Sequence, residues 1–422
     1  MRLKRRQFVG AGVAALTLSS RLLRGQTRPR IVVVGGGAGG ATAALALSRE
    51  STDSVDVVLV EPTRTYHSCF YSNLYLGGFR QHDSLAHSYT RLASQYGVNV
   101  VHDWVVGIER EAREVRLASG GTIAYDRLVL SPGIDFVPGS VPGWDLSAQS
   151  KMPHAYKGGT QLALLRSQVL AMKPGGVFAL IAPPNPYRCP PGPYERVSML
   201  ARTLQATNPS AKLLIVDPKT RFAKQALFEE SWARHYPGMI ERIDADAGGA
   251  KVEVRPERME LVIDGSVQAV DVCNVIPAQQ AGRICSAAGL TVATGWAPVV
   301  PASMRSRADE NIYILGDASQ QGDMPKSAFS ANSQAKVAVR AILASLTDSP
   351  LPRASYANTC WSLVAEDDSV KIGATYTATP EKITKVSGFV SDTGEPEATR
   401  RANYLESVGW YAGITAEMFG GP

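Results

Sequence analysis

The 422-residue sequence lacks several features that would assign it to common functional classes. After the first 28 residues, no run reaches the roughly 18 apolar residues of a membrane-spanning helix. The six histidines are dispersed, and none stands at metal-ligand spacing from a cysteine. The pattern C-x-x-C-H, which attaches a c-type haem, does not occur. We therefore expect no integral membrane segment, no metal site and no haem attached to this chain.

The charge of the chain gives no reason to expect nucleic acid as a partner. The formal net charge is +6 at pH 7, but residues 1–28 contain seven basic side chains and no acidic one. Without these seven, the formal charge falls from +6 to −1. The basic excess therefore belongs to the N-terminal segment and not to a nucleic-acid-binding surface.

That N-terminal segment has the pattern of an export signal. Arg5 and Arg6 precede a mildly apolar run over residues 9–18, which is too short to span a bilayer. Paired arginines in this position predict a twin-arginine signal over residues 1–28 and a periplasmic location. A retained basic arm is the alternative, because no A-x-A cleavage site precedes Arg30. The five cysteines are compatible with an oxidising compartment, and their odd number leaves at least one outside any internal disulfide.

A glycine-rich turn follows the first apolar strand pattern. The segment 31–40, I-V-V-V-G-G-G-A-G-G, places Gly35, Gly37 and Gly40 between a predicted strand and an alanine-rich helical stretch. Glycines there permit a tight turn and close approach of the backbone to a pyrophosphate at the helix N-terminus. A second predicted strand ends at Glu61, whose carboxylate can accept hydrogen bonds from a ribose. This order predicts a dinucleotide site, and a purely structural glycine turn is the alternative.

Two later segments favour FAD as the nucleotide. Residues 125–133, Y-D-R-L-V-L-S-P-G, and residues 311–319, N-I-Y-I-L-G-D-A-S, resemble the returning strands of two-dinucleotide flavoproteins. The resemblance implies that Gly316 and Asp317 hold the ribityl and pyrophosphate region of the flavin. A helical pattern over residues 327–346 follows, and its N-terminus can face the pyrimidine edge of the ring. An ordinary strand-to-loop turn is the alternative, since turn chemistry favours the same residues.

The second βα unit lacks the glycine fingerprint of a nicotinamide site. After a predicted strand at residues 177–182, the segment 182–196 reads A-P-P-N-P-Y-R-C-P-P-G-P-Y-E-R, with six prolines around Cys189. Proline fixes φ and has no N–H to offer a phosphate, so this loop is stiff and holds the cysteine in one orientation. We therefore expect electrons to enter through sulfur and not from NAD(P)H.

Four motifs together resemble the flavoprotein subunit of flavocytochrome c sulfide dehydrogenase. They are Y-H-S-C-F-Y-S-N at residues 66–73, C-P-P-G-P-Y-E-R at 189–196, N-T-C-W-S at 358–362 and W-Y-A-G-I-T-A-E-M-F-G at 410–420. The likeness extends over nearly the whole chain after the N-terminal segment and is more specific than a glycine motif. It implies an FAD-dependent sulfide-cytochrome-c reductase with a c-type cytochrome subunit as its partner.

The resemblance also implies roles for individual residues. Cys189 and Cys360 would form a redox-active disulfide beside the flavin, whereas sequence spacing alone leaves the cysteine pairing open. Glu195 becomes a candidate acid or base, and a first-turn glutamate that complements the helix dipole is the alternative. Cys69 matches the cysteine that can be bonded to the 8α-methyl group of the flavin, and a buried free cysteine is the alternative. Trp410 is expected either to cover the flavin or to pack in a core or interface.

We predict an α/β fold with two Rossmann-like βα domains, as in glutathione-reductase-like flavoproteins, and a C-terminal α+β interface domain. After the signal segment, the expected units are the first part of the FAD-binding domain (30–141), a second Rossmann-like domain without the NAD fingerprint (142–269), the second part of the FAD-binding domain (270–346) and a C-terminal flavocytochrome c sulfide dehydrogenase domain (347–422). Cys273 and Cys285 are expected to be core residues.

Two alternatives to sulfide oxidation with a cytochrome acceptor stay open. A sulfide:quinone oxidoreductase shares the fold but docks on a membrane and reduces quinone. A non-enzymatic sulfur- or metal-binding subunit on the same fold is the second alternative, and the retained glycines, Glu61 and Asp317 argue against it. The expected substrate is sulfide or polysulfide, and the expected cofactor is FAD, with Cys69 as its possible covalent attachment point.

Overall fold

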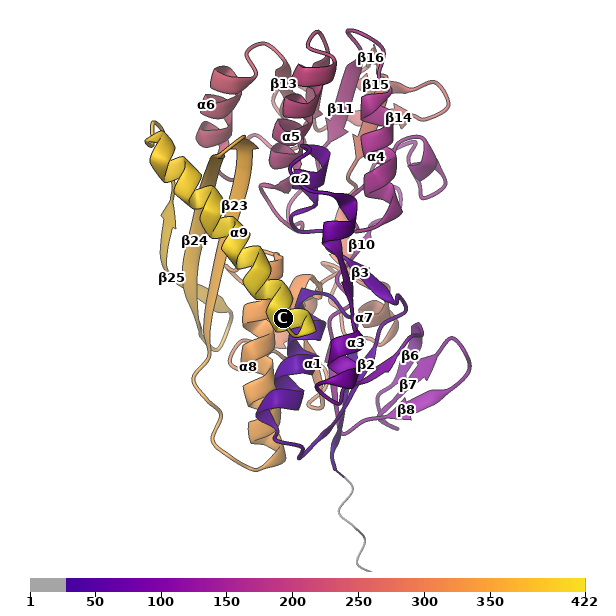
Figure 1. Cartoon of the computed structure of the whole chain (residues 1–422). Helices are drawn as coiled ribbons and strands as arrows, with labels where there is room; N and C mark the ends of the chain where they lie inside the picture. Colours follow the sequence, from indigo (N-terminus) through magenta and orange to yellow (C-terminus); the bar gives the residue numbers. More distant parts are fainter. Residues whose placement is uncertain (1–27, 422) are drawn as a thin grey trace, which may run out of the picture.

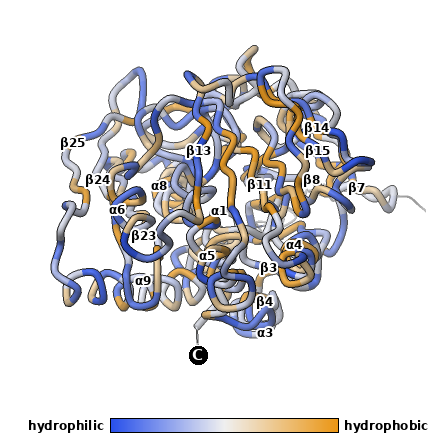
Figure 2. The backbone as a smooth tube through the Cα atoms, turned by 90° about the horizontal axis from the view of Figure 1, so that it is seen from above, coloured by the Kyte–Doolittle hydropathy of each residue, from blue (hydrophilic) through white to orange (hydrophobic). Residues whose placement is uncertain are grey.

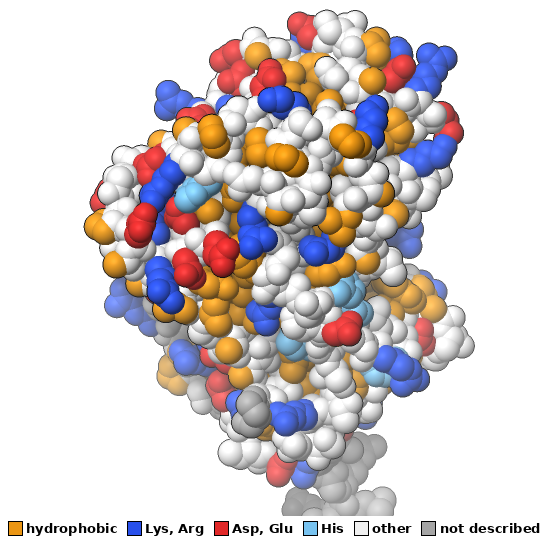
Figure 3. All heavy atoms as spheres, turned by 45° about the horizontal axis from the view of Figure 1, so that its top comes forward, with side chains coloured by type: hydrophobic (Ala, Val, Ile, Leu, Met, Phe, Trp, Pro, Cys, Tyr) orange, Lys and Arg blue, Asp and Glu red, His pale blue; other side chains and the backbone are white. Residues whose placement is uncertain are grey.

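The computed structural model describes residues 28–421 of the chain. The predicted twin-arginine signal over residues 1–28 therefore lies, except for its last residue, outside the described part. Within residues 28–421, no helix is long and apolar enough to cross a bilayer. Basic and acidic side chains are intermingled on the face shown in Figure 3, in keeping with the small net charge of the chain after residue 28.

The first domain is built on an eight-stranded sheet whose strands come from two distant parts of the chain. Across the sheet the order is β22 (Ser319–Gln320), β19 (Ala297–Val300), β20 (Arg305–Ser306), β21 (Ile312–Ile314), β9 (Arg127–Leu130), β1 (Arg30–Val34), β2 (Asp56–Val60) and β5 (Asn99–Val101). Strand β1 pairs in parallel with β2 and β9, and β21 pairs in parallel with β9. Helices α1 (Ala38–Glu50) and α8 (Ala328–Leu346) pack against each other. The loops after β1, β9 and β21 therefore meet at one edge of the sheet.

The second domain contains a four-stranded parallel sheet. Its order is β13 (Ile240–Ile243), β12 (Lys212–Val216), β11 (Val177–Ile181) and β17 (Val272–Val275), with helices α4 (Thr160–Leu170), α5 (Gly192–Thr207) and α6 (Gln225–His235). Because β17 pairs with β11, the domain extends past residue 270, which corrects the predicted boundary there. The apolar segment V-C-N-V-I-P-A suits a buried strand of either sheet, and only the pairing partner decides between them.

Smaller antiparallel sheets and short helices extend these domains. The sheets are β3 (Thr65–His67) with β4 (Ala86–Ser88), β6 (Val105–Glu109) with β7 (Glu114–Leu117) and β8 (Thr122–Ala124), β10 (Ile134–Phe136) with β18 (Gln279–Ala281), and β14 (Val252–Arg255) with β15 (Glu260–Ile263) and β16 (Ser266–Ala269). The short helices are α2 (Ser72–Leu76), α3 (Thr90–Ser94) and α7 (Arg283–Ala287). Strand β10 follows β9, where the chain leaves the first domain, and β18 follows β17, where it returns. These two strands pair with each other.

The C-terminal unit is an antiparallel sheet crossed by one long helix (Figure 1). The sheet contains β23 (Ser355–Ala365), β24 (Asp368–Ala378) and β25 (Ile383–Val390), and the helix is α9 (Glu397–Phe419). The helix continues through Gly409 and Gly413, although each glycine lowers helix stability by about 1 kcal/mol relative to alanine. Its buried side chains Tyr411, Ile414 and Met418 lie at helical spacing. A side chain at either glycine would point into open space, so helix packing does not require them.

Hydrophobic residues concentrate on the central strands, and hydrophilic residues predominate in the outer loops (Figure 2). The core of the first domain includes Tyr356, Ile414 and Met418 of the C-terminal unit. The core of the second domain includes Val364 and Tyr411 of the same unit. The C-terminal unit is thus held by both cores, and the predicted α/β fold class with a C-terminal α+β unit is confirmed.

Candidate functional site

A cavity of about 1640 Å³ is lined by residues of both domains and of the C-terminal unit. The predicted site residues that line it are Gly35, Gly37, Glu61, Cys69, Cys189, Glu195, Gly316, Asp317, Cys360 and Trp410. Gly40 is absent from this lining. It packs tightly against the turn, since a Cβ at this position would lie 1.8 Å from the carbonyl oxygen of Gly35. The structure therefore brings ten predicted residues together and assigns Gly40 to packing of the turn against its helix.

The glycine turn presents backbone N–H groups to this cavity. Gly35 has φ +96°, and a Cβ there would lie 2.4 Å from the carbonyl oxygen of Ser131, so only glycine fits. Gly37 is the N-cap of α1, and because it has no side chain it cannot cap the N–H groups of the helix itself. An added Cβ would meet only Tyr66, at 3.9 Å. The first turn of α1 contains no acidic residue. The helix N-terminus is thus suited to bind a pyrophosphate through its N–H groups.

Glu61, which directly follows β2, fixes the glycine turn. Its Oε2 accepts a hydrogen bond from the backbone N–H of Gly36 at 2.8 Å. Its Oε1 accepts bonds from the N–H and the hydroxyl of Thr63 at 3.0 and 2.7 Å. Each carboxylate oxygen has two lone pairs, so Oε2 can accept a further bond from a ribose hydroxyl. The ribose contact stays a prediction, and the bond to Gly36 is a contact that the sequence pattern did not indicate.

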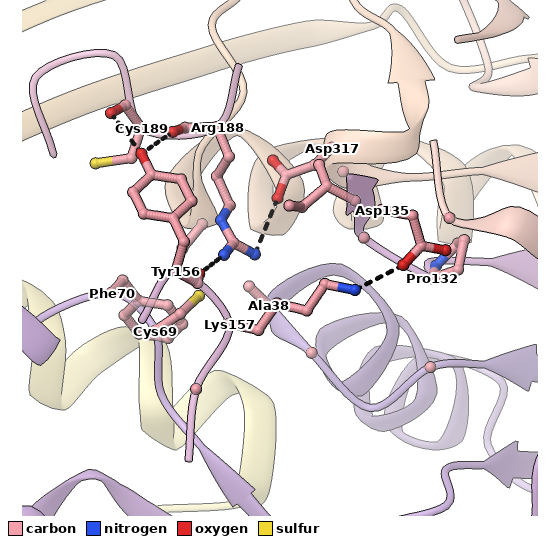
Figure 4. Close-up of a pocket in the computed structure, with 18 of the residues that line it drawn as sticks. Ala38, Cys69, Phe70, Pro132, Asp135, Tyr156, Lys157, Arg188, Cys189 and Asp317 are labelled. Carbon is pink, nitrogen blue, oxygen red and sulfur yellow. Dashed lines mark hydrogen bonds and ion pairs between the residues drawn. The ribbon is translucent and has the colours of Figure 1, made fainter. Parts of the chain in front are cut away.

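Asp317 provides a test of whether the cavity fits FAD. Its Oδ2 lies 3.9 Å from Nη1 of Arg188 (Figure 4), and its Oδ1 is buried without a hydrogen-bond partner among the described residues. Burial raises the pKa of Asp317, while Arg188 and Lys326 lower it. A buried acceptor is unfavourable unless a bound group supplies a donor. A ribityl hydroxyl supplies that donor, so Asp317 and the glycine turn fit FAD.

The proline loop holds Cys189 in a fixed orientation at the cavity wall. Cys189 has φ +56°, which is unusual for a residue with a side chain. Its N–H donates to the carbonyl oxygen of Lys326 at 2.8 Å, and its own carbonyl oxygen accepts bonds from the Gly192 N–H at 2.8 Å and the Tyr156 hydroxyl at 3.2 Å. A Cβ at Gly192 would lie 2.9 Å from the sulfur, so glycine leaves room for it.

Cys360 lies on β23 and lines the same cavity. Burial raises the pKa of both Cys189 and Cys360, and the nearby Cys360 raises that of Cys189 further. Both residues belong to the lining of one cavity. All five cysteines are free thiols in the structure, so the Cys189–Cys360 disulfide stays a prediction. Cys273 and Cys285 are fully buried in apolar clusters, which confirms that they are core residues.

Glu195 lies in the first turn of α5, and its carboxylate borders the cavity. Its Oε1 accepts from the N–H of Leu363 at 3.0 Å, and its Oε2 accepts from Nδ2 of Asn73 at 2.7 Å. Burial raises the pKa of Glu195, and these bonds together with Lys224 lower it. A buried carboxyl with a raised pKa beside two cysteines is suited to proton transfer. Sequence reasoning missed Asn73, which lies in a motif it quoted, and Lys224, which no motif marked.

An aromatic wall borders the cavity near Cys69. Cys69 lies on the loop between β3 and α2, and its neighbour Phe70 packs against Trp410 with ring centroids 5.8 Å apart. The Trp410 ring lies 5.4 Å from that of Trp361 and stacks on Phe329 at 6.1 Å. Trp410 therefore both lines the cavity and packs against other rings. A bond between Cys69 and the flavin stays a prediction.

Arg188, which directly precedes the motif 189–196, and Asn358, which begins the motif 358–362, complete the site. The guanidinium of Arg188 pairs with Asp317 and donates to the carbonyl oxygen of Tyr156 (Figure 4). Asn358 lies two residues before Cys360, and its Nδ2 donates to the cysteine sulfur at 3.5 Å. Both lie within two residues of a predicted cysteine. Arg188 contacts residues from distant segments of the chain, and such contacts cannot be read from the sequence.

The fold and the site define a flavin-dependent oxidoreductase of the two-dinucleotide-domain class. A pyridine nucleotide-disulphide oxidoreductase family model matches residues 29–169. The model for the central region of the sulfide dehydrogenase (flavocytochrome c) flavoprotein chain matches residues 162–277, and the flavin-binding model of flavocytochrome c sulphide dehydrogenase matches residues 352–419. The chain belongs to the family of flavocytochrome c sulfide dehydrogenase flavoprotein subunits.

More distant relatives share the fold. The mitochondrial sulfide:quinone oxidoreductase of Dictyostelium discoideum is 24% identical over 330 residues, which cover 74% of this chain and 69% of the relative. The X-ray structure of the sulfide:quinone oxidoreductase of Aquifex aeolicus matches with a TM-score of 0.71 and 17% identity, covering 93% of this chain and 92% of that one. A ferredoxin reductase from Rhodopseudomonas palustris matches with a TM-score of 0.63 and 20% identity, covering 82% of each chain.

Proposed function

We propose that this protein is a periplasmic sulfide dehydrogenase subunit that oxidises sulfide through a Cys189–Cys360 disulfide and bound FAD, and that it passes the electrons to a c-type cytochrome. One observation carries the proposal: both cysteines line the cavity that also contains the glycine turn and Asp317. Family membership supports sulfide as the substrate and a cytochrome as the partner. The predicted signal segment supports the periplasmic location.

The first step is thiol–disulfide chemistry. The sulfur of HS⁻ forms a bond to one cysteine sulfur, the cysteine–cysteine bond breaks, and the other cysteine leaves as a thiolate with the bonding electron pair. The proton of HS⁻ stays on the new persulfide, so one negative charge is conserved. Glu195 lies beside the pair with a raised pKa and is suited to take up or return that proton. Release of the sulfur at the oxidation level of the element leaves the two cysteines in the reduced form. The disulfide is restored when the cysteine pair gives up two electrons, which bound FAD would accept.

The remaining residues hold the cofactor and exclude water. FAD, when bound, accepts two electrons together and can release them singly, as a haem acceptor requires. The N–H groups at the start of α1 would hold its pyrophosphate, and Oδ1 of Asp317, which is buried without a partner among the described residues, would accept a hydrogen bond from a ribityl hydroxyl. The aromatic wall around Trp410 gives the cavity an apolar side, which would favour exclusion of water from the bound flavin.

A second candidate is a sulfide:quinone oxidoreductase. The likeness to two such enzymes favours it, since one is similar in sequence and the other in fold. The two candidates differ in the electron acceptor and not in the sulfur chemistry.

The acceptor decides between them. Purified protein is mixed anaerobically with sulfide or NADH while the flavin absorbance is recorded, and a c-type cytochrome or a short-chain quinone is then added. We expect sulfide to bleach the flavin, NADH to leave it oxidised, and the cytochrome to reoxidise it faster than the quinone. Faster reoxidation by quinone would favour the second candidate. Protein that binds no flavin at all would favour the non-enzymatic alternative.

A further inference from the structure

A buried lysine lies behind the sulfur site. Lys224 is only 8% exposed, although it carries an ammonium group. Its Nζ donates to the carbonyl oxygens of Cys360 and Val370 at 3.1 and 3.3 Å, and to the hydroxyl of Ser362 at 2.7 Å. All three acceptors are neutral. By contrast, the buried Lys219 forms an ion pair of 2.7 Å with Asp217.

A buried ammonium with only neutral partners requires a compensating anion nearby. Burial lowers the pKa of Lys224 to about 8, and Cys360, Glu195 and Cys189 oppose this shift, with Cys360 contributing most. Buried charges in proteins are usually paired, because desolvation without a partner is costly. The groups able to supply the negative charge are therefore those of the sulfur site itself.

Asn358 approaches the sulfur of Cys360 directly. Its Oδ1 accepts hydrogen bonds from the hydroxyls of Ser327 and Ser330 at 2.5 and 3.2 Å. Sγ of Cys360 lies 3.5 Å from Nδ2 of Asn358 and 3.8 Å from its Oδ1, so the amide contacts the sulfur through both ends. Because the two serine hydroxyls already use both lone pairs of Oδ1, the NH₂ group is the better partner for the sulfur. An N–H donor favours a charged sulfur over a neutral one.

Other titratable groups around Cys360 come from several elements. Glu195 on α5 raises the pKa of Cys360, whereas Asn358 and Lys224 lower it. The proline loop contributes Cys189 and Arg188 to the same group of charges. Tyr376 on β24 also interacts with Cys360. Within residues 28–421, the cation that lowers the pKa of Cys360 is Lys224, whereas Arg188 lowers the pKa of Cys189.

We propose that Lys224 and Asn358 hold the sulfur of Cys360 as an anion after the Cys189–Cys360 bond is opened. The inference rests on the proposed function and specifies where the negative charge of HS⁻ is placed. If Cys189 receives the sulfur, Cys360 is the thiolate that leaves. If Cys360 receives it, the persulfide proton passes to the Cys189 thiolate or to Glu195, and the terminal sulfur on Cys360 carries the charge. Lys224 does not line the cavity, so it acts through Cys360 as a positioning residue.

The test measures the acidity of Cys360 in reduced holoprotein without sulfide. A Cys189→Ser background removes the coupled thiol. Alkylation with iodoacetamide over a pH series, followed by mass spectrometry of the Cys360 peptide, gives the pKa of this one thiol. We expect Lys224→Gln to raise that pKa by at least about one unit, so that alkylation below the pKa becomes about tenfold slower. Asn358→Ala should raise it by a smaller amount.

Lys371→Gln is the matched control. Lys371 lies on β24 opposite Trp361, and its Nζ pairs with Glu406 at 2.5 Å near the surface. This substitution should leave the pKa of Cys360 unchanged. An equal shift in the control, or no shift in Lys224→Gln, would overturn the proposal. If Lys224→Gln does not retain FAD, Asn358→Ala decides, and an unchanged Cys360 pKa in that variant would equally overturn it.

The measurement separates this inference from the proposed function, because it needs no sulfide turnover. If Lys224→Gln raises the pKa of Cys360 but sulfide does not reduce the flavin of the unmutated protein, the anion site is supported and the proposed sulfide oxidation is contradicted. If sulfide reduces the flavin but Lys224→Gln leaves the pKa of Cys360 unchanged, the proposed function is supported and the role of Lys224 is contradicted.

Discussion

The two Rossmann-like units differ in the loop between a parallel strand and the helix that follows it. This loop contains glycines in the first unit, and prolines with a cysteine in the second. In the first, β1 leads through a glycine turn to α1, whose N-cap is Gly37. In the second, β11 leads through the proline loop to α5, whose N-cap is Pro191 and whose first turn contains Glu195. The first helix N-terminus is open to an anion. The second has the acidic Glu195 in its first turn, where the helix dipole favours negative charge, and the Glu195 carboxylate accepts hydrogen bonds from Leu363 and Asn73.

The acidic residues after the next strands differ in the same way. Glu61 after β2 borders the cavity and bonds the glycine turn. Asp217 after β12 is fully buried and accepts a bond from the Tyr194 hydroxyl at 2.7 Å. It also pairs with Lys219 at 2.7 Å and Arg242 at 2.9 Å, so no free acceptor faces a ribose. One strand–turn–helix unit can therefore serve a nucleotide or a reactive sulfur, depending on which groups its loop exposes.

The largest expected effect concerns the sulfur of the second unit. Cys189→Ser prevents the proposed Cys189–Cys360 disulfide, and the rate of sulfide-dependent flavin reduction should fall at least about a thousandfold because no sulfur electrophile is left. FAD content should stay normal, since the glycine turn is untouched. Stopped-flow absorbance under anaerobic conditions measures the rate. Near-normal turnover in this variant would exclude the disulfide mechanism.

The second effect is an acid sensitivity of the sulfur-carrying domain. His154 is buried, its Nδ1 accepts a bond from the Tyr156 N–H at 3.1 Å, and burial lowers its pKa to about 3. The unfolded chain therefore binds a proton below about pH 6.5 that the folded chain does not. The contribution to stability is complete above that pH and is lost as the pH falls towards 3, with about 2 kcal/mol lost between pH 7 and pH 5.

Urea unfolding of the holoprotein at these two pH values measures this loss. His154→Gln keeps a hydrogen-bond acceptor without the titrating ring, so its stability should fall less between pH 7 and pH 5. The same loss in variant and wild type would assign the acid sensitivity to other groups.

The third prediction compares two glycines in the two loops. A side chain at Gly37 points towards the cavity, and Gly37→Val should weaken FAD binding at least about tenfold, a loss of about 1.4 kcal/mol. Gly192→Ala is the matched change in the proline loop, and it should retain FAD while slowing reduction by sulfide, because its Cβ would lie 2.9 Å from the Cys189 sulfur. Flavin content and sulfide kinetics distinguish the two. Loss of FAD from both variants would contradict the division of roles.

The smallest effect on turnover concerns Cys69. If its sulfur is bonded to the 8α-methyl group, acid-precipitated protein stays yellow and its mass exceeds that of the bare polypeptide by one FAD. Cys69→Ala should bind FAD reversibly and keep the disulfide chemistry. Flavin released into the supernatant of the unmutated protein would show that Cys69 is a packing residue, with Cys189 and Cys360 unaffected.

Features encoded over short stretches could be predicted from the sequence. The strand expected at residues 177–182 is β11 (Val177–Ile181), and the helical pattern over residues 327–346 is α8 (Ala328–Leu346). The glycine turn and the proline loop were also evident, because φ restrictions, missing N–H groups and hydrophobic periodicity are properties of neighbouring residues. The resemblance to a known family added the cysteine roles, which spacing alone left open.

Tertiary structure alone decided how distant segments meet. The segment V-C-N-V-I-P-A joins the second sheet because β17 pairs with β11, and α9 forms despite two glycines because its buried face packs against both cores. The ammonium of Lys224 reaches Cys360, 136 residues further along the chain, only because α6 and β23 pack together. Local sequence thus determined which elements and reactive groups exist. Packing over long sequence separations determined which charges compensate one another, since the energy of a buried charge depends on partners that no local pattern specifies.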